Sequence, residues 1–177
     1  GMSGAIFTML SHGLTTGALF LLVGMLYDRR HTRLISDFGG LWKSVPVLSA
    51  LFIAATFASI GLPGFSGFVG EFLALLGTFR INVTVATFAS LGVILSACYA
   101  LWLYRKVVFG KLEKPTLAHI SDMGWREMLV FAPLIVLTIL LGIYPKPVID
   151  MSAASVTALL DHYHHALGAA KSAALVR

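Results

Sequence analysis

Charged residues and cysteine are both scarce in this sequence, and each scarcity excludes a class of protein. Lys, Arg, Asp and Glu make up 12% of the 177 residues, whereas soluble domains contain about 25%. Hydrophobic residues make up 58%, and the mean hydropathy is +0.87. This composition excludes a soluble globular domain, a disordered tail and a nucleic-acid-binding module. The single cysteine, Cys98, excludes a disulfide framework and an iron–sulfur cluster held by this chain alone.

Motifs for common cofactors and catalytic sites are also absent. The sequence has no G-x-G-x-x-G dinucleotide fingerprint, no phosphate-binding P-loop and no Cys/His spacing typical of a metal site. No G-x-S-x-G elbow supports a Ser–His–Asp triad, and no segment has the pattern of a removable signal peptide. We therefore expect no catalytic residue, cofactor or resident metal in this chain.

Long runs with almost no charge dominate the chain instead. They cover residues 1–27, 44–79, 81–104 and 128–145, and Glu71 is their only Lys, Arg, Asp or Glu. Because about 20 apolar residues cross a bilayer core, three of these runs each predict one transmembrane helix. We place these three helices at residues 4–27, 82–104 and 128–145. The runs lack period-two alternation, so the predicted fold class is all-α, with a transmembrane bundle over residues 1–147.

The second run is too long for one straight span. A continuous helix over its 36 residues would measure about 54 Å. Its middle contains several residues that weaken helical hydrogen bonding: Gly61, Pro63, Gly64 and Gly67. We therefore predict a span over residues 46–79 that is broken at 61–67, with half-helices at about 46–60 and 68–79. A proline kink and two short spans joined by a turn are the alternatives.

Basic residues are distributed unevenly among the predicted loops. The loops after the first and third helices hold nine Lys and Arg: Arg29, Arg30, Arg33, Lys43, Arg105, Lys106, Lys111, Lys114 and Arg126. The opposite face has Arg80 and Lys146 near the membrane. Because basic loops stay on the side from which the protein is inserted, the face with nine should be cytoplasmic, or the matrix side in a mitochondrion.

The pattern changes after Pro145, and we expect a C-terminal amphipathic helix and tail over residues 148–177. Its apolar stripe consists of Val156, Leu159, Leu160, Tyr163 and Leu167. Such a helix lies along the membrane surface or against a partner. Asp161 and His165, at i and i+4, suggest a metal site, but no third ligand is positioned by the sequence, which favours a solvated helix face.

Two ionisable residues within the apolar runs are the candidates for chemistry. An ionisable group at membrane depth is costly and indicates function by default, so we expect Glu71 to exchange protons. His12 is the only such residue in the first span, and a neutral imidazole is a good proton relay. The alternatives are a Glu71 that snorkels or pairs permanently with a Lys, and a buried His12 bonded to a neighbouring helix. Hydroxyl groups near His12 that could bond to it or hold water are those of Thr8, Ser11 and Thr16.

Several segments, taken in order, resemble one protein family. They are Ser11-His12-Gly13-Leu14, Gly24 to Arg33, Gly39-Gly40-Leu41-Trp42, Gly61 to Phe72, Tyr104-Arg105, Phe109-Gly110-Lys111 and Gly142 to Pro145. Together they resemble the antiporter-like subunit M of bacterial respiratory complex I, the counterpart of mitochondrial NADH dehydrogenase subunit 4. Sister subunits and related cation/proton antiporters usually carry Lys where this chain has Glu71.

The resemblance implies a fold of about fourteen transmembrane helices, of which this chain holds the last four, the second of them discontinuous. It implies that Glu71 and His12 belong to a proton path in a subunit of NADH:quinone oxidoreductase that has no redox centre. NADH, FMN, iron–sulfur clusters and quinone are then expected in partner subunits. The expected partners are other membrane-arm subunits and the lipid bilayer, without nucleic acid.

The expected location is the bacterial plasma membrane, with the mitochondrial inner membrane as the less favoured choice. Family members are roughly 500 residues long, so the sequence is expected to be a fragment that does not pump protons alone. The alternatives are a subunit of a cation/proton antiporter or membrane-bound hydrogenase, and a purely structural membrane scaffold.

Overall fold

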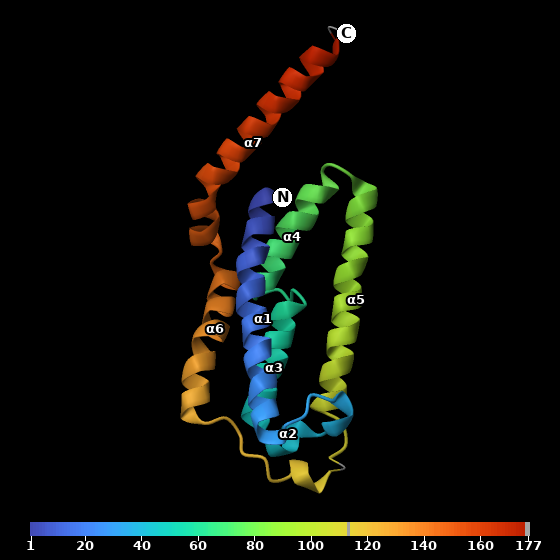
Figure 1. Ribbon diagram of the computed structural model, residues 1–177, viewed down its shortest axis with the longest axis vertical. Helices are drawn as coiled ribbons and strands as arrows, with labels where there is room; N and C mark the ends of the chain where they lie inside the picture. The colour runs from blue at the N-terminus through green and yellow to red at the C-terminus, as the bar shows by residue number, and fades with distance from the viewer. Residues whose placement is uncertain (113, 176–177) are drawn as a thin grey trace.

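The computed structural model describes residues 1–112 and 114–175, with side chains described as far as residue 168, and the fold there is all-helical. Five helices form an elongated bundle, and a sixth long helix continues beyond it (Figure 1). The long helices are α1 (Met2–Arg30), α3 (Pro46–Ser59), α4 (Ser66–Phe79), α5 (Val83–Val107), α6 (Trp125–Ile143) and α7 (Lys146–Leu175). The short elements are η1 (Ile35–Asp37), α2 (Leu41–Ser44) and η2 (Pro115–Leu117).

The predicted fold class is confirmed in the described residues. Helices α1, α5 and α6 are long and apolar enough to cross a membrane. Helices α3 and α4 are apolar but have only 14 residues each, about 21 Å apiece. Together they match the length of α1, so they make one discontinuous crossing. The second half-helix begins at Ser66 rather than at residue 68, so the break is shorter than predicted.

Small residues bring α1 and α4 together along most of α4. An ideal Cβ at Gly4 would lie 2.7 Å from the Leu73 Cβ, and one at Gly70 would lie 2.8 Å from the Thr8 backbone nitrogen. Both distances are shorter than side chains tolerate, so these glycines permit the backbones to approach closely. Close packing of small residues drives helix association in lipid, and it fixes α4 antiparallel to α1 (Figure 1).

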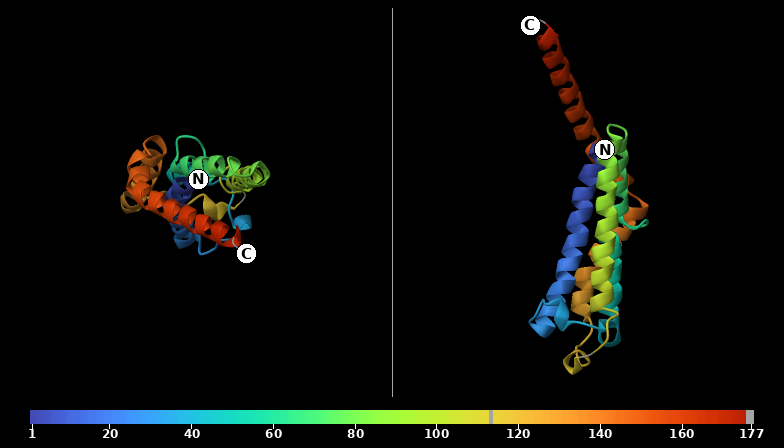
Figure 2. Two further views of the ribbon diagram at one scale, coloured as in Figure 1. Left: turned by 90° about the horizontal axis from the view of Figure 1, so that it is seen from above. Right: turned by 90° about the vertical axis from the view of Figure 1, so that its right-hand side faces the viewer.

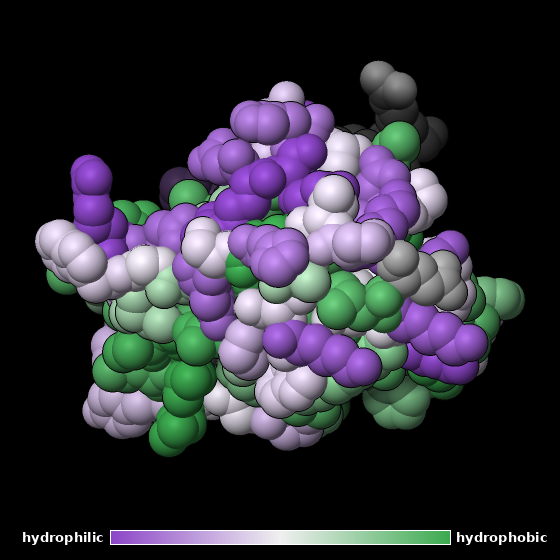
Figure 3. All heavy atoms as spheres, turned by 90° about the horizontal axis from the view of Figure 1, so that it is seen from below, coloured by the Kyte–Doolittle hydropathy of each residue, from purple (hydrophilic) through white to green (hydrophobic). Residues whose placement is uncertain are grey.

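The two basic loops meet at one end of the bundle. The Lys114 ammonium pairs with the Asp37 carboxylate at 2.5 Å, which joins the loop after α5 to η1. This ion pair and the hydroxyl of Thr32, which donates to Asp37, hold the pKa of the Asp37 carboxyl below its usual range, so the pair persists at neutral pH. Seen from this end, hydrophilic side chains gather over the surface (Figure 3).

Arg29 joins three segments at the same end. Its guanidinium donates to both carboxylate oxygens of Glu127 at 2.7 and 2.8 Å, and to the backbone carbonyls of Ser121 and Asp122. The Asp122 carboxylate in turn accepts the backbone N–H groups of Val47 and Leu48 at the start of α3. A bidentate pair of this kind fixes orientation as well as distance, so α1, α3 and α6 are locked together near the loops.

Within its described residues, helix α7 packs against the N-terminal part of α1 with its first half. It then extends past the end of the bundle that lies opposite the basic loops (Figure 2). Of the predicted apolar stripe, Val156 is buried, whereas Leu159, Leu160, Tyr163 and Leu167 are exposed. The predicted helix is present and begins at Lys146, and residues 176–177 lie outside the described residues.

The shared position of the basic loops predicts their chemical accessibility in the membrane. In the assembled protein with Cys98→Ser, we expect His31→Cys and His119→Cys to react with a membrane-impermeant maleimide from one side only. Ile81→Cys, in the loop between α4 and α5, should react from the other side and serves as the matched control. Labelling of the first two positions from opposite sides would contradict the four-crossing fold.

Candidate functional site

The break between α3 and α4 is a defined backbone structure made of two consecutive turns. Helix α3 ends in a Schellman motif, in which the N–H of Leu62 donates to the Phe57 carbonyl and that of Gly61 donates to the Ala58 carbonyl. Gly61 has φ +73°, the left-handed conformation that this motif requires. The Phe65 N–H then donates to the Leu62 carbonyl at 3.1 Å, which closes a β-turn.

Pro63 and Gly64 occupy the two central positions of that β-turn. Gly64 has φ +100°, and a proline followed by a residue with positive φ is the pattern of a type II turn. A type II turn favours proline at its first central position and glycine at its second, so the local sequence encodes the break. It does not depend on a partner subunit that bends the helix.

The sequence predicted that Gly67 is part of the break, and this was wrong. Gly67 lies in the first turn of α4. A Cβ there would collide with the Ala58 carbonyl oxygen of α3. Gly142 of α6 makes a similar approach from outside, because a Cβ on it would meet the Gly64 carbonyl and lie 2.5 Å from the Phe65 carbonyl carbon. The absence of side chains at these two positions lets α3, α4 and α6 approach closely around the break, while residues 62–64 stay exposed in this chain.

Glu71 lies in α4, half-buried, with its carboxylate over the start of the break. An ideal Cβ on Gly61 would be 2.6 Å from the Glu71 Oε2 and 3.3 Å from the carboxylate carbon. Within the described part of the chain, the Glu71 carboxylate makes no hydrogen bond or ion pair. The permanent Lys partner considered as an alternative is therefore not supplied by these residues.

His12 lies on the outer, exposed face of α1. Its imidazole is 3.3 Å from the Thr16 hydroxyl, so one of the three predicted hydroxyl neighbours does contact it. The other two bond elsewhere: Thr8 donates to the Gly4 carbonyl and Ser11 shares a 2.7 Å hydrogen bond with Ser66. Ser11 is next to His12 in the sequence and therefore points in another direction from α1. Thr8 lies one turn away on the same face as His12, but its hydroxyl donates to the Gly4 carbonyl instead.

The Ser11–Ser66 hydrogen bond sets the relative depth of the two candidates. It joins α1 to the first residue of α4, so His12 lies at the level where the break ends. Glu71 lies five residues further along α4, about 7.5 Å along its axis. The two residues thus lie within about two helical turns of the same depth, but among the described residues no hydrogen bond or ion pair joins them directly.

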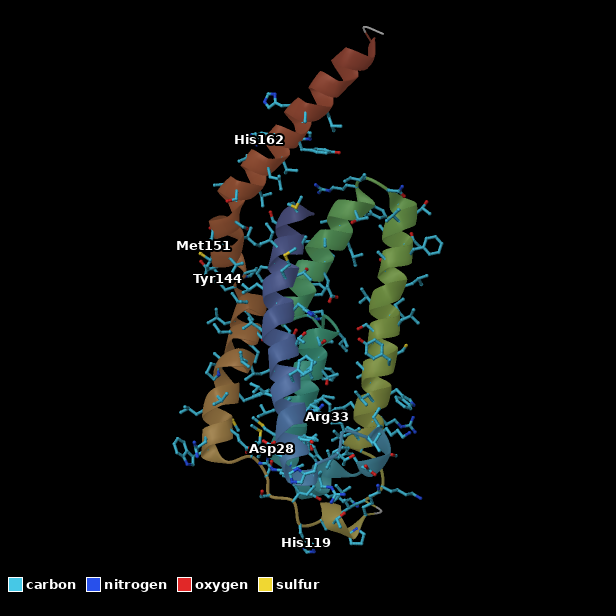
Figure 4. All side chains as sticks on the ribbon, viewed as in Figure 1. Asp28, Arg33, His119, Tyr144, Met151 and His162 are labelled. Carbon is cyan, nitrogen blue, oxygen red and sulfur yellow. The ribbon has the colours of Figure 1, made fainter. Side chains whose placement is uncertain are left out.

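The remaining histidines lie far from this site. His119 is at the basic end and His162 is on α7 beyond the bundle (Figure 4). Among the described residues no group of three or more His, Cys, Asp and Glu side chains is placed to hold a metal ion. Asp161 and His165 are exposed on α7, as expected for a solvated helix face.

Two residues that position the site were missed at the sequence level. Ser66 anchors the start of α4 to α1, and Gly142 gives α6 its close approach to the break. A glycine within the apolar run at 128–145 was a usable signal for close packing. Nothing in the sequence paired Ser66 with Ser11, which is 55 residues away.

Because Gly61 is left-handed and faces Glu71, its substitution should be costly. We expect Gly61→Ala to destabilise the full-length protein by about 1–2 kcal/mol from backbone conformation alone, and further through the clash with the carboxylate. Gly92→Ala is the control, since Gly92 is in mid-α5 with open space around it, and should be neutral or stabilising. Equal thermal stability of the two variants in the assembled complex would argue against the described break.

Comparisons with known proteins agree with this arrangement. Subunit M of NADH-quinone oxidoreductase from Rhodobacter capsulatus is 58% identical over 95% of this chain and 33% of its own length. NADH-ubiquinone oxidoreductase chain 4 from Marchantia polymorpha is 48% identical over 92% of this chain and 33% of its own. The chain thus spans about a third of the length of these relatives.

The solved structure of respiratory complex I from Thermus thermophilus with bound NADH contains a chain that superposes with a TM-score of 0.74. It is 36% identical over 86% of this chain and 33% of its own length. Residues 1–97, which hold α1, the break and most of α5, match the family described as the transmembrane part of NADH:quinone oxidoreductases and Mrp antiporters. The chain therefore belongs to the NADH:quinone oxidoreductase/Mrp antiporter transmembrane family.

Proposed function

We propose that this chain is part of a membrane-arm subunit that moves protons in NADH:quinone oxidoreductase. The observation that carries the proposal is the Glu71 carboxylate, which has no hydrogen-bond or ion-pair partner among the described residues. It faces a break in a membrane-crossing helix. Discontinuous helices are the usual setting of ion sites in transporters, because irregular backbone at membrane depth lines protein or water.

The lack of a fixed partner suits Glu71 to proton exchange. A charged side chain at the bilayer centre costs about 2.5–3.5 kcal/mol on insertion scales, which favours the neutral carboxylic acid form of Glu71. Water in the break would instead favour the charged carboxylate. When the charged and neutral forms are close in energy, a small change nearby moves the proton on or off. A permanent ion pair such as Arg29–Glu127 at the basic end would hold the carboxylate charged instead.

His12 is the second proposed member of the proton path. Its side of α1 is bare in this chain: nothing lies within 4 Å of ideal Cβ positions at Gly13 and Gly17, and Phe20 is 73% exposed. Small residues at i and i+4 suit a close helix contact. We propose that helices from the rest of the subunit cover this face, so that His12 and Thr16 lie inside the complete protein.

Protons cannot pass directly between His12 and Glu71, since no contact links them. We propose that water bridges the gap near the hydroxyls of Ser11, Thr15 and Ser66, which lie at the level of the break. Water near polar residues at a helix break is a common route for protons in membrane proteins.

The proposed orientation places the basic end in the cytoplasm of a bacterium, following the excess of Lys and Arg there. Helix α7 is then on the opposite side of the membrane, where its apolar stripe lies on the membrane surface or on a neighbouring subunit. Electron transfer is assigned to other subunits, which would hold NADH, FMN, iron–sulfur clusters and quinone, as the family resemblance implies.

A subunit of a cation/proton antiporter or of a membrane-bound hydrogenase is the alternative function, because the family includes Mrp antiporters. Identities of 58% and 48% to subunit M and chain 4 favour the oxidoreductase. Copurification of the full-length protein with NADH-binding and iron–sulfur subunits would distinguish the two.

The proposed role of Glu71 predicts that two conservative substitutions reduce proton pumping to different extents. In the assembled complex, we expect Glu71→Gln to lose most NADH-driven proton pumping, because Gln keeps the shape but has no titratable proton. Glu71→Asp should retain part of the pumping, because it keeps the titratable group. Proton uptake into sealed vesicles, measured together with NADH oxidation, reports both effects.

Assembly is checked first, since loss of a packed subunit would imitate loss of the relay. Asp28→Asn is a suitable control: it removes an exposed acidic group from the same chain at the basic end, outside the proposed path. If Glu71 only fills space, Gln should be tolerated at least as well as Asp. Wild-type pumping by a fully assembled Glu71→Gln complex would remove Glu71 from the proton path.

A further inference from the structure

The basic end of the bundle contains an open cavity of about 620 Å³ that the proton path does not use. It lies between the segment after η1 and the end of α5. Its lining includes three cationic side chains and no acidic one. The residues that matter for its chemistry are Phe38, Trp102, Arg105, Lys106, Phe109 and Lys111.

The cationic groups of this cavity have no acidic partner in the part of the chain that the structure describes. Among the described residues no ion pair involves Arg105, Lys106 or Lys111. Among the described residues, Asp37 is the acidic residue next to the lining residues 36 and 38, and its carboxylate already accepts hydrogen bonds from Lys114 and Thr32. Three cations around one hollow, with no ion-pair partner among the described residues, form a site that attracts an anion.

The cavity lies where a membrane surface would be. Helix α5 ends at Val107, so Arg105 and Lys106 are at the end of the span, while Trp102 is one turn further into it. Trp102 is 56% exposed, and the Lys106 ammonium lies 5.0 Å from the centre of its ring. Tryptophan at headgroup level with basic residues just beyond it is the usual arrangement at a membrane interface.

A second, apolar cavity adjoins the first and favours an amphiphilic ligand. It measures about 190 Å³, and its lining is mostly apolar, with Val23, Leu103 and Val107 among its members beside the polar Thr32 and Arg33. Phe38 lines both cavities. A basic hollow at the membrane surface, next to an apolar hollow within the span, matches a ligand with a phosphate group and a hydrocarbon chain.

We propose that this basic cavity binds the phosphate headgroup of an anionic phospholipid, with Arg105 and Lys111 as the main charge partners and Trp102 at the glycerol level. The shared chemistry is a phosphate anion, and the depth of the site and the adjoining apolar cavity assign it to a lipid rather than to free phosphate. The proposal requires only that the chain spans the membrane, so it stands or fails independently of proton transfer by Glu71.

A photo-crosslinking experiment on the assembled complex tests this directly. Trp102 is replaced by benzoylphenylalanine, and the complex is placed in nanodiscs with equal amounts of phosphatidylglycerol and phosphatidylcholine. Mass spectrometry of this subunit then gives the ratio of the two lipid adducts. Trp125 is the matched control position, because it is a tryptophan at the same end, 76% exposed and outside the cavity. We expect an excess of phosphatidylglycerol at position 102 and a ratio near that of the bulk lipid at 125.

Charge removal identifies the residues responsible. Arg105→Gln with Lys111→Gln should lower the preference at position 102 by at least about five-fold, since each basic residue near an anionic surface contributes about 1 kcal/mol. Lys43→Gln with Arg126→Gln removes the same two residue types from exposed positions outside the cavity and should leave the preference unchanged. Equal ratios at positions 102 and 125, or equal effects of the two double variants, would overturn the proposal.

Soluble phosphate is distinguished by competition. If the cavity takes a free anion, glycerol phosphate should abolish the preference at position 102, whereas sodium chloride at the same ionic strength should not. That result would overturn the assignment to a lipid. A preference that survives glycerol phosphate supports it.

Discussion

The rest of the structure depends on one constraint: backbone polar groups at membrane depth must find partners within the protein. The break after α3 meets this constraint with two turns, whose N–H groups at Ile60, Gly61, Leu62 and Phe65 all donate to carbonyls of the same segment. The two turns use positive φ at Gly61 and Gly64. The Schellman motif and the type II turn therefore allow the crossing to be interrupted without unpaired donors at these positions.

The same glycines determine what surrounds the break. Because Gly61 has no side chain, the Glu71 carboxylate can lie over it, and because Gly142 has none, α6 can approach Gly64 and Phe65 from outside. At the other end of α3, the bidentate Arg29–Glu127 pair and the Asp122 cap hold the helices together. The bundle is thus fixed by polar contacts at its basic end and by close backbone packing around its centre, where Glu71 has no partner among the described residues.

The helices were predictable from the sequence because charge-free runs and breakers have direct physical meaning in a bilayer. The break was predicted within one helical turn of its observed position. Gly67 was wrongly included in it, because a glycine that packs against Ala58 cannot be told from one that bends the chain by sequence alone. The contacts of Ser11 with Ser66 and of Arg29 with Glu127 join residues 55 and 98 positions apart, and periodicity within a single helix contains no information about them. The importance of Glu71 and His12 came from charge at membrane depth and from family resemblance, and their proton transfer stays a prediction.

The central claim is that Glu71 changes its protonation state while the complex works. Infrared difference spectroscopy of the assembled complex during NADH oxidation measures this most directly, with Glu71→Gln used to assign the carboxyl band. We expect a carboxylic C=O stretching change in the wild-type complex that is missing from the variant. Identical carboxyl regions in the two difference spectra, from complexes that both oxidise NADH, would contradict it.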